Sequence, residues 1–331
     1  MTRLLLRADA SPVIGAGHIS RVVAYAERAV ARGWAVSFSG RTDNAEWLAS
    51  RFDELGVPRL QPADDGPALG RLAEDFDVVL VDHYELGDLR KDVNNVGALL
   101  VSIEDGTFGR RAADVVADCG FAPAPRPEDG SPVLLRGVAY APLRDVVLAA
   151  RDKRQHVRLD GPLRVTVVLG GGGAWAGVVS AILTALSETG LSFAARVLAR
   201  GDVTVPAAFD GQSFEVTGPG TNLHDLLVDT DLAVSAAGVT LLELCCLGVP
   251  TAVVRLVDNQ VTGYRGALDH GLAAGIGSGE SLLAGGQEAG SVLSDLLSRS
   301  TERERLAATA AATVDGLGAD RVLDAVSEIL A

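Results

Sequence analysis

Cysteine is scarce in this sequence, which has only three among 331 residues: Cys119, Cys245 and Cys246. The last two are adjacent, so they could not easily form a structural disulfide with each other. The three also lack the spacing that is typical of metal sites. The scarcity of cysteine therefore predicts a reducing setting and gives no support to a disulfide framework or a cysteine-bound metal.

Long apolar runs and an excess of positive charge are also missing. Leu4–Leu6 is too short for the core of a signal peptide, and no apolar run approaches the roughly 20 residues that span a bilayer. Lysine and arginine together number 29 against 43 acidic residues, which gives a formal net charge of −14. Nucleic acid and anionic membranes would repel such a chain at long range. We therefore expect a cytoplasmic protein, monomeric or weakly homo-oligomeric, that binds neither nucleic acid nor membrane.

The length fits two domains of about 150 residues each. Short segments rich in Val and Leu alternate with amphipathic stretches, which is typical of parallel strands joined by helices. A polar segment at 149–156 interrupts this pattern and predicts an N-terminal domain at 1–150 and a C-terminal domain at 151–331. We expect strands at 4–6, 35–39, 78–81, 98–103, 115–117, 164–169, 193–198, 232–235 and 251–254. The result is an α/β protein of two doubly wound, Rossmann-like parallel-sheet domains, with amphipathic helices at 301–330.

A glycine loop follows the first expected strand. Gly15 and Gly17 allow the backbone to come close to a ligand, and an amphipathic helix begins immediately afterwards and is stopped by Gly33. The start of a helix offers unpaired N–H groups and a positive dipole end to an anion, and His18 stands at that edge. A tight turn with a merely capping or solvated histidine is an equally good interpretation of this motif by itself.

A second glycine loop, Gly170–Gly173, follows the expected strand at 164–169, so that Gly171 and Gly172 are candidate ligand contacts. Neither loop has the dinucleotide pattern G-x-G-x-x-G or the P-loop pattern, so nicotinamide chemistry and nucleoside triphosphate hydrolysis are poorly supported. A mobile surface loop is the alternative, less favoured because the glycines directly follow a strand of the buried type.

The segment Asp229–Gln260 predicts a strand, a turn of small residues, a helix, a strand and a polar loop. The helix after Gly238 would direct its N-terminus at a phosphate, and Glu243, about one turn further on, could accept both hydroxyls of a ribose. Glu243 could equally be a solvent-facing helix residue. Asp258–Gln260 could be no more than a polar turn.

Several pieces that span most of the chain resemble the UDP-sugar hydrolases of the pseudaminic acid pathway, which cleave UDP from a 2,4-diacetamido-2,4,6-trideoxy hexose. The matching pieces are Arg7–Ser11 with Ile14–Arg21, Val81–Tyr84, Leu134–Tyr140 with Leu143–Arg144, and Ser235–Gln260. The last piece also looks like the donor-nucleotide region of the glycosyltransferases that build peptidoglycan precursors. The sequence departs from the hydrolase pattern after Gly170–Gly173, where a serine and an aspartate are missing, so the sugar could differ.

The resemblance implies a two-domain GT-B fold, with the active site in the cleft between the domains, and a UDP-sugar as substrate. It implies that His18 deprotonates an attacking water and that Tyr84, beside Asp82, lies near the sugar. The expected substrate contacts are Gly15, Gly17, Arg21, Gly171, Gly172, Gly238, Val239, Thr240, Glu243, Asn259 and Gln260. Among these, Glu243 would hold the ribose and Gly238–Thr240 the pyrophosphate.

Neither a metal nor another cofactor is expected, because UDP is a good leaving group once helix dipoles and N–H groups meet its charge. The two Asp-x-Asp motifs, at 75–77 and 229–231, directly precede strands and are interpreted as turns. One or two of Asp82, His83 and Tyr84 could be caps of a strand end.

Two other functions remain open. A GT-B glycosyltransferase would use His18 to deprotonate an acceptor hydroxyl or amine in place of water, although the exposed apolar or basic patch of a membrane-acceptor enzyme is not evident. A non-catalytic nucleotide-sugar binding protein is disfavoured because His18 is present.

Overall fold

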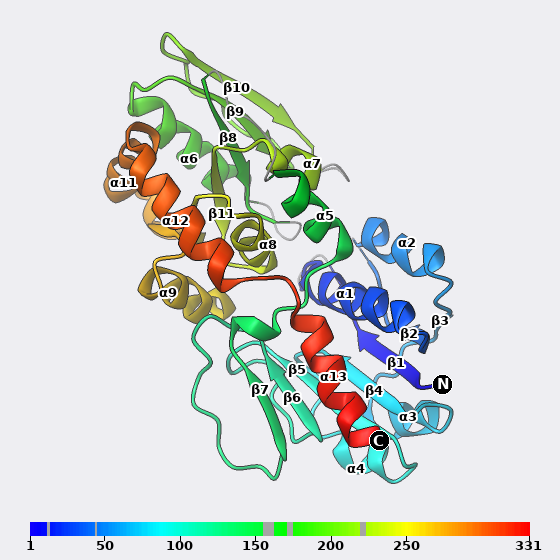
Figure 1. Ribbon diagram of the computed structural model, residues 1–331. Coiled ribbons are helices and arrows are strands. Elements are labelled where there is room, and N and C mark those ends of the chain that lie inside the picture. Colours follow the sequence, from blue (N-terminus) through cyan, green and yellow to red (C-terminus); the bar gives the residue numbers. More distant parts are fainter. Residues whose placement is uncertain (12–13, 44, 155–161, 171–174, 219–222) are drawn as a thin grey trace. The chain divides into compact units, whose positions relative to one another are not determined.

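The computed structural model describes residues 1–11, 14–43, 45–154, 162–170, 175–218 and 223–331 (Figure 1). Contacts divide the chain into two compact units. Unit 1 consists of Met1–Asp145 and Gly316–Ala331, and unit 2 consists of Val146–Asp315. None of the described helices is both long and apolar enough to cross a membrane.

Unit 1 contains a parallel sheet of seven strands in the order β3-β2-β1-β4-β5-β6-β7. The strands are β1 (Arg3–Ala8), β2 (Ala35–Ser39), β3 (Arg59–Leu60), β4 (Val78–Asp82), β5 (Leu99–Glu104), β6 (Val115–Asp118) and β7 (Val133–Arg136). The helices are α1 (Gly17–Ala31), α2 (Glu46–Glu54), α3 (Gly66–Ala73), α4 (Arg90–Asn94), η1 (Val138–Tyr140) and α13 (Gly318–Leu330).

Alternating side chains of β1 place apolar groups on both faces of this sheet. Leu4 and Leu6 belong to the core that contains residues of α1, α2 and α13. Leu5 belongs to the other core, with residues of α3 and α4. Burial on both faces explains why the central strands are nearly continuous apolar runs.

Unit 2 contains a parallel sheet of six strands in the order β10-β9-β8-β11-β12-β13. The strands are β8 (Leu163–Val168), β9 (Phe193–Leu198), β10 (Gln212–Thr217), β11 (Leu232–Ala236), β12 (Thr251–Arg255) and β13 (Ala274–Ser278). The helices are α5 (Asp145–Arg154), α6 (Ala176–Glu188), α7 (Leu223–Val228), α8 (Val239–Leu247), η2 (Asp258–Gln260), α9 (Val261–Asp269), α10 (Gly279–Leu283), α11 (Gln287–Ser298) and α12 (Ser300–Thr313).

The two parallel-sheet α/β units confirm the predicted fold class, and every predicted strand is present. The end of the chain differs from the expected division at 151–331, because α13 belongs to unit 1. The physical reason is burial: Val322, Leu323 and Val326 of α13 are fully covered in the core that contains α1. Figure 1 shows this red C-terminal helix beside the blue α1, which it contacts.

Candidate functional site

The strand order reverses direction between β1 and β4 in unit 1, and between β8 and β11 in unit 2. In open parallel sheets, ligands bind at the carboxyl ends of the strands that flank such a reversal. In unit 1 these ends carry the glycine loop before α1 and Asp82, the last residue of β4. In unit 2 they carry Gly170 and the turn before α8.

His18 and Asp82 are brought together at the reversal in unit 1. The predicted helix start is confirmed, because His18 is the second residue of α1. Its Nδ1 lies 2.5 Å from Oδ1 of Asp82. Arg21, one turn along α1, donates to the same carboxylate from Nε at 2.6 Å and from Nη2 at 2.8 Å. All three side chains are buried.

The charge of Asp82 is strongly stabilised. Burial alone would raise the pKa of this carboxyl, but the Arg21 charge, His18 and their hydrogen bonds hold the pKa well below its usual range. Nδ1 of His18 lies 2.5 Å from this carboxylate and 3.0 Å from Nη2 of Arg21, and we assign the proton to Nδ1 from the shorter contact, since two lone pairs at that distance would repel each other. The other ring nitrogen, Nε2, makes no hydrogen bond within the described part of the chain. The pair therefore presents Nε2 as a proton acceptor in a fixed orientation.

Tyr84 packs against this pair. Its ring meets the His18 ring edge-on, with centroids 4.4 Å apart. Its hydroxyl donates a hydrogen bond to Oδ2 of Asp105 at 2.7 Å. Burial raises the pKa of Tyr84 above its ordinary value; the charge of Arg21 opposes this rise and Asp105 adds to it. Tyr84 therefore remains protonated and fixes one side of the His18 ring.

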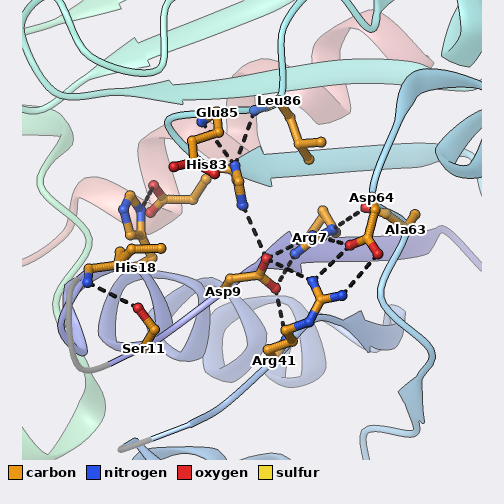
Figure 2. Close-up of polar contacts among 12 residues, drawn as sticks. Arg7, Asp9, Ser11, His18, Arg41, Ala63, Asp64, His83, Glu85 and Leu86 are labelled. Atoms are coloured by element: carbon orange, nitrogen blue, oxygen red, sulfur yellow. Dashed lines mark hydrogen bonds and ion pairs between the residues drawn. The ribbon is translucent and has the colours of Figure 1, made fainter.

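His83 has a different role from His18 (Figure 2). Its Nε2 lies 3.1 Å from Oδ2 of Asp9, and its Nδ1 accepts hydrogen bonds from the N–H groups of Glu85 and Leu86 at 3.1 Å. Both ring nitrogens are therefore occupied. His83 caps the turn after β4, as one interpretation of Asp82–Tyr84 predicted.

Asp9 anchors the loop after β1. Arg7, which is fully buried, pairs with its carboxylate through Nη1 at 2.5 Å and Nη2 at 2.9 Å. The backbone N–H of Arg41 donates to it at 2.8 Å. Burial opposes ionisation of Asp9, but His83, Arg7 and Arg41 together hold its pKa well below the usual range. Figure 2 shows this network extending from Asp9 to Asp64.

Arg21 was predicted to contact substrate, and the structure places its guanidinium against Asp82 and His18. Its charge is required there, because a buried carboxylate needs a partner. Gly15 has a positive φ of 81° and Gly17 begins α1, so both lie in the loop that leads to His18.

The predicted nucleotide residues of unit 2 gather around the N-terminus of α8. Gly238 is its N-cap, and Val239 and Thr240 are its first residues. Glu243 is buried, and its Oε2 lies 3.5 Å from Nε2 of His224. The alternative of a solvent-facing Glu243 is therefore wrong, since the helix turns this residue inward.

The polar loop after β12 forms the short helix η2, which contains Asn259 and Gln260. Oε1 of Gln260 accepts the N–H of Leu256 at 2.9 Å. A Cβ placed on Gly238 would lie 3.7 Å from Nε2 of Gln260, so this side chain reaches the turn before α8. Gly171 and Gly172 lie outside the described residues.

Both Asp-x-Asp motifs contain aspartates that pair with arginines. Asp77 binds Arg3 with a shortest distance of 2.8 Å, while Asp229 binds Arg164 and Arg196. These contacts fit their interpretation as turns before strands.

Sequence reasoning assigned no role in the site to Asp105, Phe108 or His224. Asp105 and Phe108 lie in the loop after β5, the neighbour of β4, and that position was the available signal. His224 had none, because its contact depends on how α7 packs on α8.

No protein-family model and no curated protein sequence matches the chain, but solved structures do. MurG from Acinetobacter baumannii is 16% identical with a TM-score of 0.66, covering 99% of this chain and 100% of that one. The S. aureus MnaA–UDP structure is 11% identical with a TM-score of 0.61, covering 100% and 97%. The UDP-GlcNAc 2-epimerase from Neisseria meningitidis, bound to UDP-GlcNAc, is 12% identical with a TM-score of 0.61, covering 98% and 100%. These likenesses and the two parallel sheets show a two-domain GT-B fold.

Proposed function

We propose that this protein is a UDP-sugar hydrolase that releases UDP from an activated amino or deoxy sugar, of the kind used in pseudaminic acid biosynthesis. The observation that carries the proposal is the His18–Asp82 pair, with Nδ1 held 2.5 Å from the carboxylate and Nε2 left to accept a proton. The sequence resemblance supports the choice of substrate. The fold, shared with proteins whose structures contain UDP or UDP-GlcNAc, supports a nucleotide sugar.

The reaction needs one base and one stabilised leaving group. Nε2 of His18 removes a proton from water while the water oxygen bonds to the anomeric carbon. The bond between that carbon and the phosphate oxygen breaks, and its electron pair leaves with UDP. The Asp82 carboxylate stabilises the imidazolium that forms, which then returns its proton to solvent.

Unit 2 supplies the nucleotide contacts in this proposal. The N–H groups at the start of α8, a helix of nine residues, face the pyrophosphate charge after Gly238. Glu243 holds the ribose, and Asn259 and Gln260 contact the sugar or phosphate side. Unit 1 supplies the base and the sugar side. Neither a metal ion nor a cofactor takes part, because UDP leaves readily once these groups meet its charge.

The test is mass spectrometry of the protein with UDP-2,4-diacetamido-2,4,6-trideoxy-altrose and no acceptor. We expect equal amounts of free sugar and UDP from the native protein and a loss of at least about 10²-fold with His18→Ala. His270→Ala is the matched control, because His270 is an exposed histidine at the end of α9. An intact donor after incubation with correctly folded native protein would overturn hydrolysis of this substrate.

Glycosyl transfer is the second candidate, and the likeness to MurG and to other glycosyltransferase structures favours it. His18 would then deprotonate a hydroxyl or amine acceptor. Donor consumption that requires an added acceptor, and that is also lost in His18→Ala, would replace hydrolysis by transfer.

A further inference from the structure

The loop between β5 and β6 is built as a rigid support. Asp105 and Phe108 exchange backbone hydrogen bonds of 3.1 and 3.0 Å. Arg110 donates from Nε to the carbonyl of Gly106 at 2.8 Å. Buried Arg111 donates to the carbonyls of Leu86, at 2.9 Å, and His83, which ties this loop to the turn after β4.

Gly109 allows the two loops to meet. Its φ of 71° suits glycine, and a Cβ there would lie 3.2 Å from the carbonyl oxygen of His83 and 3.4 Å from the Tyr84 ring. Because residue 109 has no side chain, the two loops can approach closely and the ring of Phe108 can lie against Tyr84.

The result is an exposed ring in a fixed position. Phe108 is 39% exposed, and its ring centroid lies 5.5 Å from that of Tyr84, whose ring in turn contacts His18. Single exposed apolar residues are common and need no explanation. Phe108 differs from such residues in two ways. Its loop is held by hydrogen bonds at several points, and only the ring of Tyr84 lies between it and His18, the proposed base.

We propose that Phe108 and Tyr84 form an aromatic sugar subsite, in which the Phe108 ring stacks on the apolar C–H face of the pyranose of the nucleotide sugar. The inference rests on the proposed function, because it requires a sugar whose anomeric carbon faces a water on His18. The negative face of an aromatic ring attracts the weakly positive C–H groups of a sugar and provides an apolar surface for them. The UDP part of the donor is bound by other residues, so Phe108 contributes nothing to the affinity for UDP.

Equilibrium binding tests the subsite in the His18→Ala background, where the donor remains intact. The probes are UDP and UDP-2,4-diacetamido-2,4,6-trideoxy-altrose, titrated by calorimetry into the background protein and its Phe108→Leu and Phe108→Tyr derivatives. We expect Phe108→Leu to weaken UDP-sugar binding about five- to tenfold and to leave UDP binding unchanged. Phe108→Tyr, which keeps the ring, should retain the affinity. The backbone hydrogen bonds of the loop do not depend on the side chain.

Trp47→Leu is the matched control, because Trp47 is an aromatic residue of unit 1, 43% exposed, that packs on Arg144. Equal UDP-sugar affinity in Phe108→Leu and its parent would overturn the subsite and leave the proposed function standing. A parallel loss of UDP and UDP-sugar affinity would also overturn it, since the effect would not be on the sugar. A background protein that binds neither probe would overturn both the subsite and the proposed function.

Discussion

His18 and His83 show how local hydrogen bonds separate two histidines that look alike in the sequence. Each approaches an aspartate, but His83 also receives two backbone N–H groups and has no nitrogen left for chemistry. His18 has its Nδ1 occupied and its Nε2 available. The sequence placed His18 at a helix start next to a glycine loop, but which ring nitrogen it offers depends on a residue 64 positions away.

Replacing Asp82 by asparagine tests this pair directly. In Asp82→Asn, the amide favours the histidine tautomer with its proton on Nε2, which cannot act as the base. We expect kcat to fall by about 10²- to 10⁴-fold with little change in KM, measured by UDP release. Asp77→Asn, at the other end of β4, should keep full kcat.

Loss of the Asp82 charge also leaves buried Arg21 unpaired, which costs about 3–5 kcal/mol of stability. Thermal unfolding of Asp82→Asn must therefore be followed, and kcat compared below the transition. Normal turnover by a folded Asp82→Asn protein would contradict the role of the pair.

The three thiols should be inert in the folded protein. Burial raises the pKa of Cys119 and of Cys245 to about 12, and burial also raises the pKa of Cys246. A pKa near 12 leaves about 10³-fold less thiolate at pH 8 than an ordinary thiol has. We expect an aromatic disulfide reagent to label all three rapidly in urea and none on the same timescale without it. Rapid labelling of one thiol in native protein would contradict this burial.

At the scale of elements, the strands that the sequence predicted are the interior ones. The four it missed, β3, β7, β10 and β13, are the four edges of the two sheets. An edge strand keeps one side exposed and carries polar residues there, so its apolar signal is weak. β10 shows this, because four of its six residues are exposed.

The candidate site could also be predicted only in part. Residues at or just after the ends of interior strands, such as Asp82 and Gly238, could be found from the end of an apolar run. Contacts such as Tyr84–Asp105 and His224–Glu243 join side chains from separate loops or helices, and no spacing in the sequence encodes them.

Helix α13 provides a test of how the chain is divided. Leu323 is fully buried in the core of unit 1, so Leu323→Ala should cost about 2–5 kcal/mol of the stability of that unit. Ile329→Ala, on the same helix but 41% exposed, should change it by less than about 0.5 kcal/mol. Hydrogen exchange at increasing urea concentrations, followed separately for the amides of unit 1 and of unit 2, measures the free energy of unfolding of each unit in the two variants. Equal destabilisation of unit 2 by Leu323→Ala would contradict the assignment of α13.

At the scale of the whole molecule, the buried carboxylates predict how stability depends on pH. Asp9 and Asp82, both in unit 1, have pKa values held below the ordinary range, so the unfolded state binds protons at them more readily. Their contribution is complete above about pH 5 and is lost progressively as the pH falls below that value. Burial raises the pKa values of Glu27, Glu104 and Asp118, so protonation of these groups favours the folded state as the pH falls and partly offsets the loss.

Acid should therefore unfold unit 1 before unit 2. The chain has three tryptophans, with Trp34 and Trp47 in unit 1 and Trp175 in unit 2. The variant Trp175→Phe keeps tryptophans only in unit 1, so its fluorescence reports the unfolding of unit 1. The double variant Trp34→Phe/Trp47→Phe keeps only Trp175 and reports the unfolding of unit 2. Between pH 7 and pH 3 we expect unit 1 to lose about 1 kcal/mol per depressed carboxyl in urea titrations, and unit 2 to lose less. Asp9→Asn should lower stability at pH 7 and flatten this dependence, because the asparagine cannot titrate. An equal loss in both units, or an unchanged slope in Asp9→Asn, would mean that the acid sensitivity lies in other groups than the buried network around β1 and β4.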